Sequence, residues 1–337
     1  MPGILQASSS NTTRWQVKEL HPTFGAEIED LNLATISDED FTTILDLMSE
    51  YGFLVIRNAG LEDTSHVDFS RRFGDLDDIR PYLTGGRKPR CAHYELFDAG
   101  NVDDKGQILD PDSPRAHYGK GNGFFHVDSS FNPRRASYSL LRAQKLPPPG
   151  HGGNTEFADS RTAFDTLPDA VKQKLMDSKY VGCHSLHSSR KRGSPDFFKD
   201  LHPEDFAMHR HQIAQKHEPS GRMNLYIGAH LHHIEALSEL ESWQLIWSLT
   251  GWTTRPENMV SVDWKNEGDL IIWDNTAVLH RAAGGSYEGK CVRDLRRTTV
   301  HDGSSTAWGL NEKMDTRPGF NSNENPANQK VMDALNS

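Results

Sequence analysis

Between residues 37 and 51, apolar side chains recur at the spacing of one helical face. Ser37, followed by Asp40, resembles a capping box that opens a helix there. Gly52 suits the C-terminal cap of this helix. The next four residues, FLVI at 53–56, then predict a short buried strand.

The same pattern predicts two more helices, over residues 63–73 and 234–249, followed by Gly74 and Gly251. Much of the remaining chain consists of short apolar runs between Gly and Pro, which favours strands. Examples are 136–141, 223–227, 269–273 and 292–300. A few helices around many strands indicate an α+β fold. No glycine-rich loop follows a strand and opens a helix, so dinucleotide-binding and P-loop enzymes gain no support.

The length of the chain bounds its organisation. It has 337 residues, of which 35% are hydrophobic, enough to bury a large globular core. The first dozen residues and the stretch after about Trp308 are polar. We therefore expect a single domain over residues 1–337, with an ordered core at about 14–308 and flexible tails.

Charge and cysteine content narrow the choice of partners. The formal net charge of −10 argues against a nucleic-acid partner, and we interpret the lone basic run at 190–192 as a solvated loop rather than a phosphate clamp. No apolar run approaches the length that crosses a bilayer. The three cysteines show no paired spacing, which is typical of a reducing compartment and predicts a cytoplasmic protein.

The chain has 17 histidines, so a His-X-acid triplet is weak evidence for a pair of metal ligands. On a strand residues i and i+2 share a face, whereas on a helix they diverge. Three triplets lie in a predicted helix, in a Pro-containing loop or at a helix start: His66/Asp68, His202/Glu204 and His233/Glu235.

Two triplets survive this test. His93/Glu95 has no supporting partner nearby. His126-Val127-Asp128 lies between residues 121–125 (GNGFF) and 129–131 (SSF), a pattern that predicts a strand end opening into a cavity. It is the best candidate for a pair of metal ligands.

A third ligand must come from elsewhere in the chain. Two imidazoles and one carboxylate on one face of Fe(II) leave three positions open. His280 follows the strand-like run at 268–275 and is the natural choice. Beyond it, Arg293 and Arg297 are spaced to share one face of a strand. Two guanidinium groups in a metal cavity would need anionic partners, but a surface strand with solvated arginines explains this spacing equally well.

Several motifs in this order resemble the TauD/TfdA family of Fe(II)/2-oxoglutarate dioxygenases, from about Phe24 to about Asp302. The motifs are FGAEI (24–28), FSRRFG (69–74), FHVDSSF (125–131), GGNTEF (152–157), WDN (273–275), HR (280–281) and RDLRRT (293–298). The resemblance implies a double-stranded β-helix, or jelly roll, with flanking helices. Residues 180–222 match poorly, and we expect them to form part of a substrate lid.

The resemblance also assigns roles to individual residues. It implies that Fe(II) is held by His126, Asp128 and His280. It implies that the distal carboxylate of 2-oxoglutarate, the co-substrate, is bound by Thr155 and Arg293. Arg297 would meet an acidic group of the primary substrate. Lys120 either lines the substrate pocket or is solvated, and solvation is the simpler interpretation.

The implied reaction consumes 2-oxoglutarate and O₂ and releases succinate and CO₂. It oxidises a C–H bond of a small acidic substrate, such as a carboxylate, sulfonate or amino acid, by hydroxylation, desaturation or cyclisation. The family also suggests a homo-oligomer, either a dimer or a tetramer. Two rival classes are a zinc-dependent hydrolase, to which His230, His232 and His233 would add donors, and a non-catalytic jelly-roll binding protein.

Overall fold

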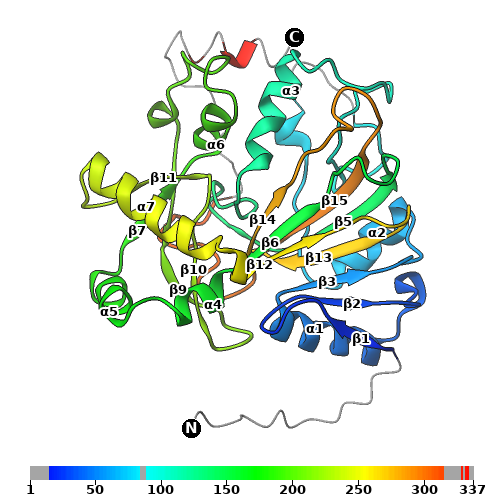
Figure 1. The fold of residues 1–337 in the computed structure, drawn as a ribbon, viewed down its shortest axis with the longest axis horizontal. Helices are drawn as coiled ribbons and strands as arrows, with labels where there is room; N and C mark the ends of the chain where they lie inside the picture. Colours follow the sequence, from blue (N-terminus) through cyan, green and yellow to red (C-terminus); the bar gives the residue numbers. More distant parts are fainter. Residues whose placement is uncertain (1–14, 84–88, 315–327, 329–330, 334–337) are drawn as a thin grey trace.

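The computed structural model describes residues 15–83, 89–314, 328 and 331–333 (Figure 1). Helix α1 (Asp38–Tyr51) begins and ends as predicted. The Ser37 side chain accepts a hydrogen bond from the main-chain N–H of Asp40, and Gly52 caps the other end with a φ of 73°. The predicted tails lie largely outside the described residues.

A seven-stranded sheet forms the larger wall of the core, in the order β1-β2-β3-β13-β5-β15-β4. Its strands are antiparallel to their neighbours except for the parallel pair β2 and β3. Their bounds are Val17–Glu19 (β1), Ala26–Ile28 (β2), Phe53–Ile56 (β3), Leu270–Asp274 (β13), Ala136–Lys145 (β5), Asp294–His301 (β15) and Phe97–Asp98 (β4). The predicted strands at 53–56, 136–141, 269–273 and 292–300 therefore all exist within a few residues.

A smaller sheet, β12-β6-β14, packs against one face of the larger one. It consists of Met259–Val262 (β12), Thr155–Asp159 (β6) and Val278–Ala282 (β14). Phe157 of β6 stacks on Phe53 of β3, with ring centroids 4.3 Å apart, and also contacts Trp273 of β13. These buried aromatic rings join the two sheets into a sandwich.

The opposite face of the large sheet is covered by α1 and by α2 (Asp63–Arg71). Buried Ile44 and Met48 of α1 pack there with Leu140 and Ile272. Each face of the large sheet is thus apolar, which explains the continuous burial of β3 and β13.

The remaining elements lie around this sandwich (Figure 1). The other helices are α3 (Pro114–Gly119), α4 (Ser160–Asp165), α5 (Asp169–Ser178), α6 (Leu186–Gly193) and α7 (Glu239–Thr253). Two small sheets contain β7 (Val181–His184), β8 (His209–Gln212) and β11 (Leu231–Ile234), and β9 (Ala214–Lys216) with β10 (Met223–Leu225). Short 3₁₀ turns are η1 (Leu33–Thr35), η2 (Arg80–Tyr82), η3 (Lys120–Gly123), η4 (Pro203–Asp205) and η5 (Pro256–Asn258).

The predicted bounds of two helices were wrong. Helix α2 ends two residues earlier than residue 73. Helix α7 begins at Glu239 rather than at Ile234, which belongs to β11. A capping box between Ser238 and Glu241 fixes the true start, and Gly251 lies inside the helix rather than after it.

The basic run at 190–192 is not the solvated loop that we expected. It lies in α6, and Arg190 is only 8% exposed. Arg192 donates hydrogen bonds to the main-chain carbonyls of Ala229 and Leu231, at 3.3 and 2.9 Å. Two of these basic side chains therefore tie α6 into the fold instead of forming a free surface cluster.

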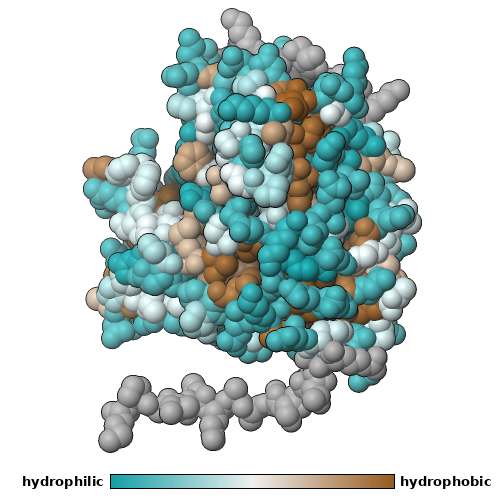
Figure 2. All heavy atoms as spheres, turned by 45° about the vertical axis from the view of Figure 1, so that its right-hand side comes forward, coloured by the Kyte–Doolittle hydropathy of each residue, from teal (hydrophilic) through white to brown (hydrophobic). Residues whose placement is uncertain are grey.

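Hydrophilic residues cover most of the face drawn in Figure 2, with apolar patches confined between them. Among the described residues, no helix combines the length and the apolar character that a membrane crossing requires.

Candidate metal centre

His126 and His280 are paired across two antiparallel segments. The main-chain N–H of each donates to the carbonyl of the other, at 3.0 and 2.9 Å. Directly opposite residues in an antiparallel pair place their side chains on the same face. The two imidazole rings consequently lie 4.3 Å apart between centroids, with His280 held by β14.

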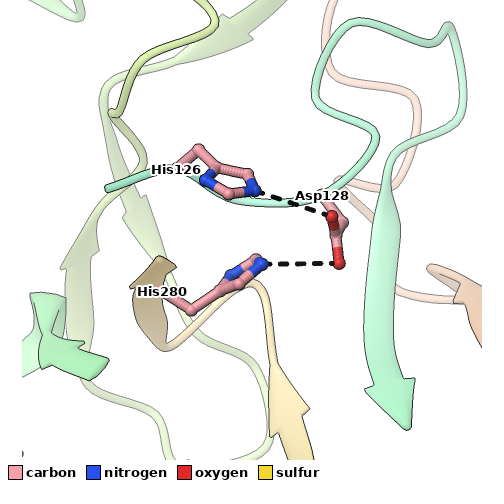
Figure 3. Close-up of side chains that lie close together, drawn as sticks. All are labelled: His126, Asp128 and His280. Atoms are coloured by element: carbon pink, nitrogen blue, oxygen red, sulfur yellow. Dashed lines mark ion pairs between the residues drawn. The ribbon is translucent and has the colours of Figure 1, made fainter. Parts of the chain in front are cut away.

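Asp128 completes the group from the turn that follows His126 (Figure 3). Its Oδ1 lies 3.9 Å from Nε2 of His126, and its Oδ2 lies 3.7 Å from Nε2 of His280. One ligand atom from each of the three side chains lies within 4.8 Å of the others, and all three residues are buried. Figure 3 shows both imidazoles directed toward the carboxylate.

The protonation states suit metal binding. Nδ1 of His126 lies 2.7 Å from the carbonyl oxygen of Phe124, which can only accept, so the proton must be on Nδ1 and the Nε2 lone pair is free. Burial lowers the pKa of His126, and burial together with neighbouring His126 lowers the pKa of His280. Both imidazoles are therefore neutral, and each can bind a metal through a nitrogen lone pair.

Asp128 is ionised and held at both oxygens. Ser139 Oγ donates to Oδ2 and Arg297 Nη1 donates to Oδ1, both at 2.7 Å. Burial alone would raise the pKa of Asp128, but the positive charge of Arg297, helped by the two histidines and Ser139, lowers it to about 2. Arg297 thus lies beside the candidate metal centre, where its ion-pair partner is the protein's own carboxylate.

Arg293 has no such partner. Its side chain is buried, and its Nε donates to the carbonyl of Gly153 at 2.9 Å. Among the described residues it forms no ion pair with an acidic side chain, and burial lowers its pKa. Thr155 lies two residues beyond Gly153, 3% exposed, and its hydroxyl accepts a bond from the Trp264 indole at 3.3 Å. The alternative interpretation, in which Arg293 and Arg297 are solvated on a surface strand, was therefore wrong.

Histidines of the other triplets have ordinary partners. His66 lies inside α2, where its Nε2 is 3.3 Å from the Thr298 hydroxyl. His93 contacts Thr64, and His202 contacts its own Glu204 at 3.1 Å. Within the described part of the chain, none of these joins a three-residue ligand group.

Other candidates stand outside the centre. Lys120 is exposed, and its ammonium lies 3.2 Å from His117 rather than beside the three candidate ligands. His230 packs edge-on against His126, but neither it nor His232 or His233 belongs to the ligand group.

Sequence reasoning missed two residues that hold the centre. Ser139 touches the Asp128 carboxylate, and Asn275 accepts a hydrogen bond from the Asp128 main chain at 2.8 Å. Asn275 was part of the WDN motif, but nothing in that motif revealed its contact, 147 residues away along the chain.

A family model described as taurine catabolism dioxygenase TauD, TfdA family, matches residues 16–299. The chain belongs to this family. An alpha-ketoglutarate-dependent 2,4-dichlorophenoxyacetate dioxygenase of Cupriavidus pinatubonensis is 34% identical over 285 residues, covering 84% of this chain and 96% of that protein. An (S)-phenoxypropionate/alpha-ketoglutarate-dioxygenase of Sphingobium herbicidovorans is 29% identical over 299 residues, covering 87% and 98%.

A solved structure agrees with these relatives. The crystal structure of AAD-2 in complex with Mn(II) and N-oxalylglycine superposes with a TM-score of 0.77 at 31% identity, covering 85% of this chain and 97% of that one. The predicted family, the α+β jelly-roll fold and the dioxygenase class are therefore confirmed. The zinc hydrolase and the non-catalytic binding protein gain no support.

Proposed function

We propose that this TauD/TfdA-family dioxygenase binds Fe(II) through His126, Asp128 and His280 and binds 2-oxoglutarate through Arg293 and Thr155. The observation that carries the proposal is the pairing of a buried two-histidine, one-carboxylate group with a buried arginine that forms no ion pair with any acidic side chain among the described residues. A metal site alone would not need the arginine, and an anion site alone would not need the three ligands.

The donor set fits the metal. Two neutral imidazoles and one ionised carboxylate on one side of Fe(II) are the ligands of non-haem iron oxygenases, and such a set leaves positions open for a chelating co-substrate and O₂. Iron bound there would supply the oxidative chemistry that couples loss of CO₂ from 2-oxoglutarate to oxidation of a C–H bond. The chain itself keeps both imidazoles neutral, orients Asp128 and excludes bulk water by burial.

Arg293 fits the far carboxylate of 2-oxoglutarate. A buried guanidinium without an anion is costly, and a charge-assisted pair with a ligand carboxylate removes that cost. Its Nε is already committed to Gly153, which orients the remaining N–H groups. We propose that the buried hydroxyl of Thr155, on β6, adds a second polar contact to this carboxylate. Holding the distal end fixes where the other end of the molecule lies.

Arg297 supports an acidic primary substrate. Its Nη1 holds Asp128, while its buried Nε has no hydrogen-bond partner within the described part of the chain. A substrate carboxylate or sulfonate could take up this remaining donor capacity. The two relatives compared above are named for phenoxy acids, and another relative, from Saccharomyces cerevisiae, is named a sulfonate dioxygenase. We propose the same breadth here, amino acids included, with hydroxylation, desaturation or cyclisation as the outcome.

The test of the metal and co-substrate site is an anaerobic optical titration of the full-length protein with Fe(II) and 2-oxoglutarate. A weak visible charge-transfer band is expected only when both are present, and it should vanish in a His126→Ala variant. Bound metal without any band in folded wild-type protein would contradict the proposal.

The substrate proposal has its own assay. Acidic compounds are screened for stimulated succinate release, and the best of them is repeated with Arg297→Ala. A KM for that compound raised at least about tenfold is expected, because a charge-assisted hydrogen bond is lost. Unchanged KM values for every acidic substrate would exclude Arg297 from recognition.

A homo-oligomer in the cytoplasm remains part of the proposal. The three cysteines are free thiols, which suits a reducing compartment. On α7, Leu240, Trp243 and Trp247 are 63%, 56% and 62% exposed, an apolar face suited to a second copy. Sedimentation equilibrium of the wild type and of a Trp247→Glu variant tests this, and a monomeric wild type would refute it.

A further inference from the structure

The three candidate ligands are fixed in different ways. His126 and His280 are fixed by the reciprocal main-chain hydrogen bonds between their own segments. Asp128 lies in the following turn, where Ser129 adopts a φ of 55°, unusual for a residue with a side chain. The carboxylate therefore depends on side-chain contacts for its orientation.

Those contacts come from the middle of β5. Ser139 is fully buried, opposite Trp273 of β13 on one side and Thr299 of β15 on the other. Its hydroxyl accepts a hydrogen bond from Nδ2 of Asn275 at 3.0 Å and donates to Oδ2 of Asp128 at 2.7 Å. Because Asn275 donates to a lone pair of Ser139 Oγ, the single hydroxyl proton of Ser139 is directed at Asp128.

Asn275 is itself fixed. Its Oδ1 accepts from the main-chain N–H of Asp128 at 2.8 Å and from the Trp273 indole at 3.1 Å. Its Nδ2 donates to the main-chain carbonyl of Ser137 and to Ser139, each at 3.0 Å. Both polar atoms of the Asn275 amide take part in these four hydrogen bonds. The amide therefore cannot flip without breaking all four.

We propose that Ser139 and Asn275 are positioning residues that hold the Asp128 carboxylate in its metal-binding orientation, with Asn275 setting the direction in which Ser139 donates. The inference rests on the proposed assignment of Asp128 as a metal ligand. Groups that hydrogen-bond to a metal-binding carboxylate preorganise it, and their loss typically weakens metal affinity by about 10- to 100-fold.

The same strand supplies a matched control. Ser137 points to the same face as Ser139, two residues earlier, and is also buried. Its hydroxyl contacts only the main-chain carbonyls of Val300 and His301, at 3.4 Å. A Ser137→Ala variant therefore removes a buried hydroxyl from β5 without touching Asp128.

The experiment measures the dissociation constant of Co(II) from the metal-loaded full-length enzyme, by competition with a chelator of known affinity. Ser139→Ala is expected to weaken binding about 10- to 100-fold, whereas Ser139→Thr, which keeps the hydroxyl, and Ser137→Ala stay near wild type.

Two contrary results are distinguishable. Wild-type affinity in Ser139→Ala, with binding lost in Asp128→Ala, would overturn the positioning role and leave the ligand assignment standing. Wild-type affinity in Asp128→Ala would overturn the ligand assignment and the inference with it. Should Ser139→Ala fail to fold, Ser139→Cys replaces it: weakened Co(II) binding is expected from the poorer S–H donor, and unchanged binding would overturn the proposal.

Discussion

Arg293 and Arg297 lie four residues apart, the first just before β15 and the second within it, yet their surroundings differ in kind. Arg297 pairs with the ionised carboxylate of Asp128, so its charge is balanced within the protein. Arg293 is more deeply buried. Its Nε donates to a main-chain carbonyl, its guanidinium carbon lies 5.9 Å from the centroid of the Tyr287 ring, and among the described residues it forms no ion pair with an acidic side chain. Two identical side chains four residues apart therefore mark two different sites, one balanced by the fold and one for which we propose an anionic ligand.

Removing the balancing carboxylate should have the largest effect. Asp128→Ala deletes one of three proposed ligands and leaves both arginines without an acid. We expect metal content to collapse and 2-oxoglutarate turnover to fall by more than about 100-fold, beyond what loss of a supporting residue costs. Metal analysis and succinate release measure this, and near-normal metal content would contradict the proposed ligand set.

Arg293→Met should separate ligand binding from stability. The KM for 2-oxoglutarate is expected to rise about 10- to 100-fold, because a buried charge-assisted contact is lost. The thermal midpoint without ligand should stay level or rise, because the change removes an unbalanced buried charge.

Arg297→Met is the matched control, and it should lower that midpoint by leaving Asp128 without its charge partner. If both variants were destabilised equally in the absence of 2-oxoglutarate, the contrast between the two arginines would fail.

The pH dependence of stability tests the ion pair between Arg297 and Asp128. The pKa of Asp128 is about 2 in the folded protein, below its ordinary value of 3.8. The unfolded chain therefore binds the proton first, and the stabilisation is complete above pH 3.8 and lost as the pH falls through about 2.

Arg297→Met should reduce the stabilisation that the ionised Asp128 contributes to the folded protein. The urea midpoints of metal-free wild type and variant should therefore differ most above pH 3.8 and converge toward pH 2. A difference that stayed constant across this range would mean that Arg297 does not set the pKa of Asp128.

The smallest effect is expected far from both arginines. Ser238→Ala removes the capping box of α7 and should cost about 1 kcal/mol of unfolding free energy. The KM for 2-oxoglutarate and the metal affinity should not change. Chemical denaturation and the two binding assays test this, and a shift in metal affinity would show that the two regions are coupled.

Local signals explain which parts of the fold could be predicted. The start of α1 follows from Ser37, whose side chain bonds within the same turn. The start of α7 was missed because the apolar pattern continues through Ile234, which is the last residue of β11 in the sheet β11-β7-β8. The capping box of Ser238 and Glu241 is a local signal for the true start of α7, whereas the pairing of Ile234 with β7 depends on tertiary structure.

The candidate site shows the same division. His126 and Asp128 share a short stretch. The geometry of helices and strands left two of five similar triplets, and the residues that flank His126 and Asp128 favoured this one. The link from Arg297 to Asp128 spans 169 residues, and the contacts of Ser139 and Asn275 cross between strands. No local pattern encodes such contacts, so the sequence indicated the ligands but not the residues that hold them.

The reciprocal pairing of His126 with His280 also bears on the order of events during folding. It joins segments from distant parts of the chain, and closing such a long loop is slow because its entropy must be lost before the contacts form. The imidazoles meet only after β14 has docked, so an unfolded or half-folded chain offers no complete chelate. If these residues hold the metal as proposed, we expect metal capture to be a late step, and a metal-centred optical signal would report completion of the native topology rather than early collapse.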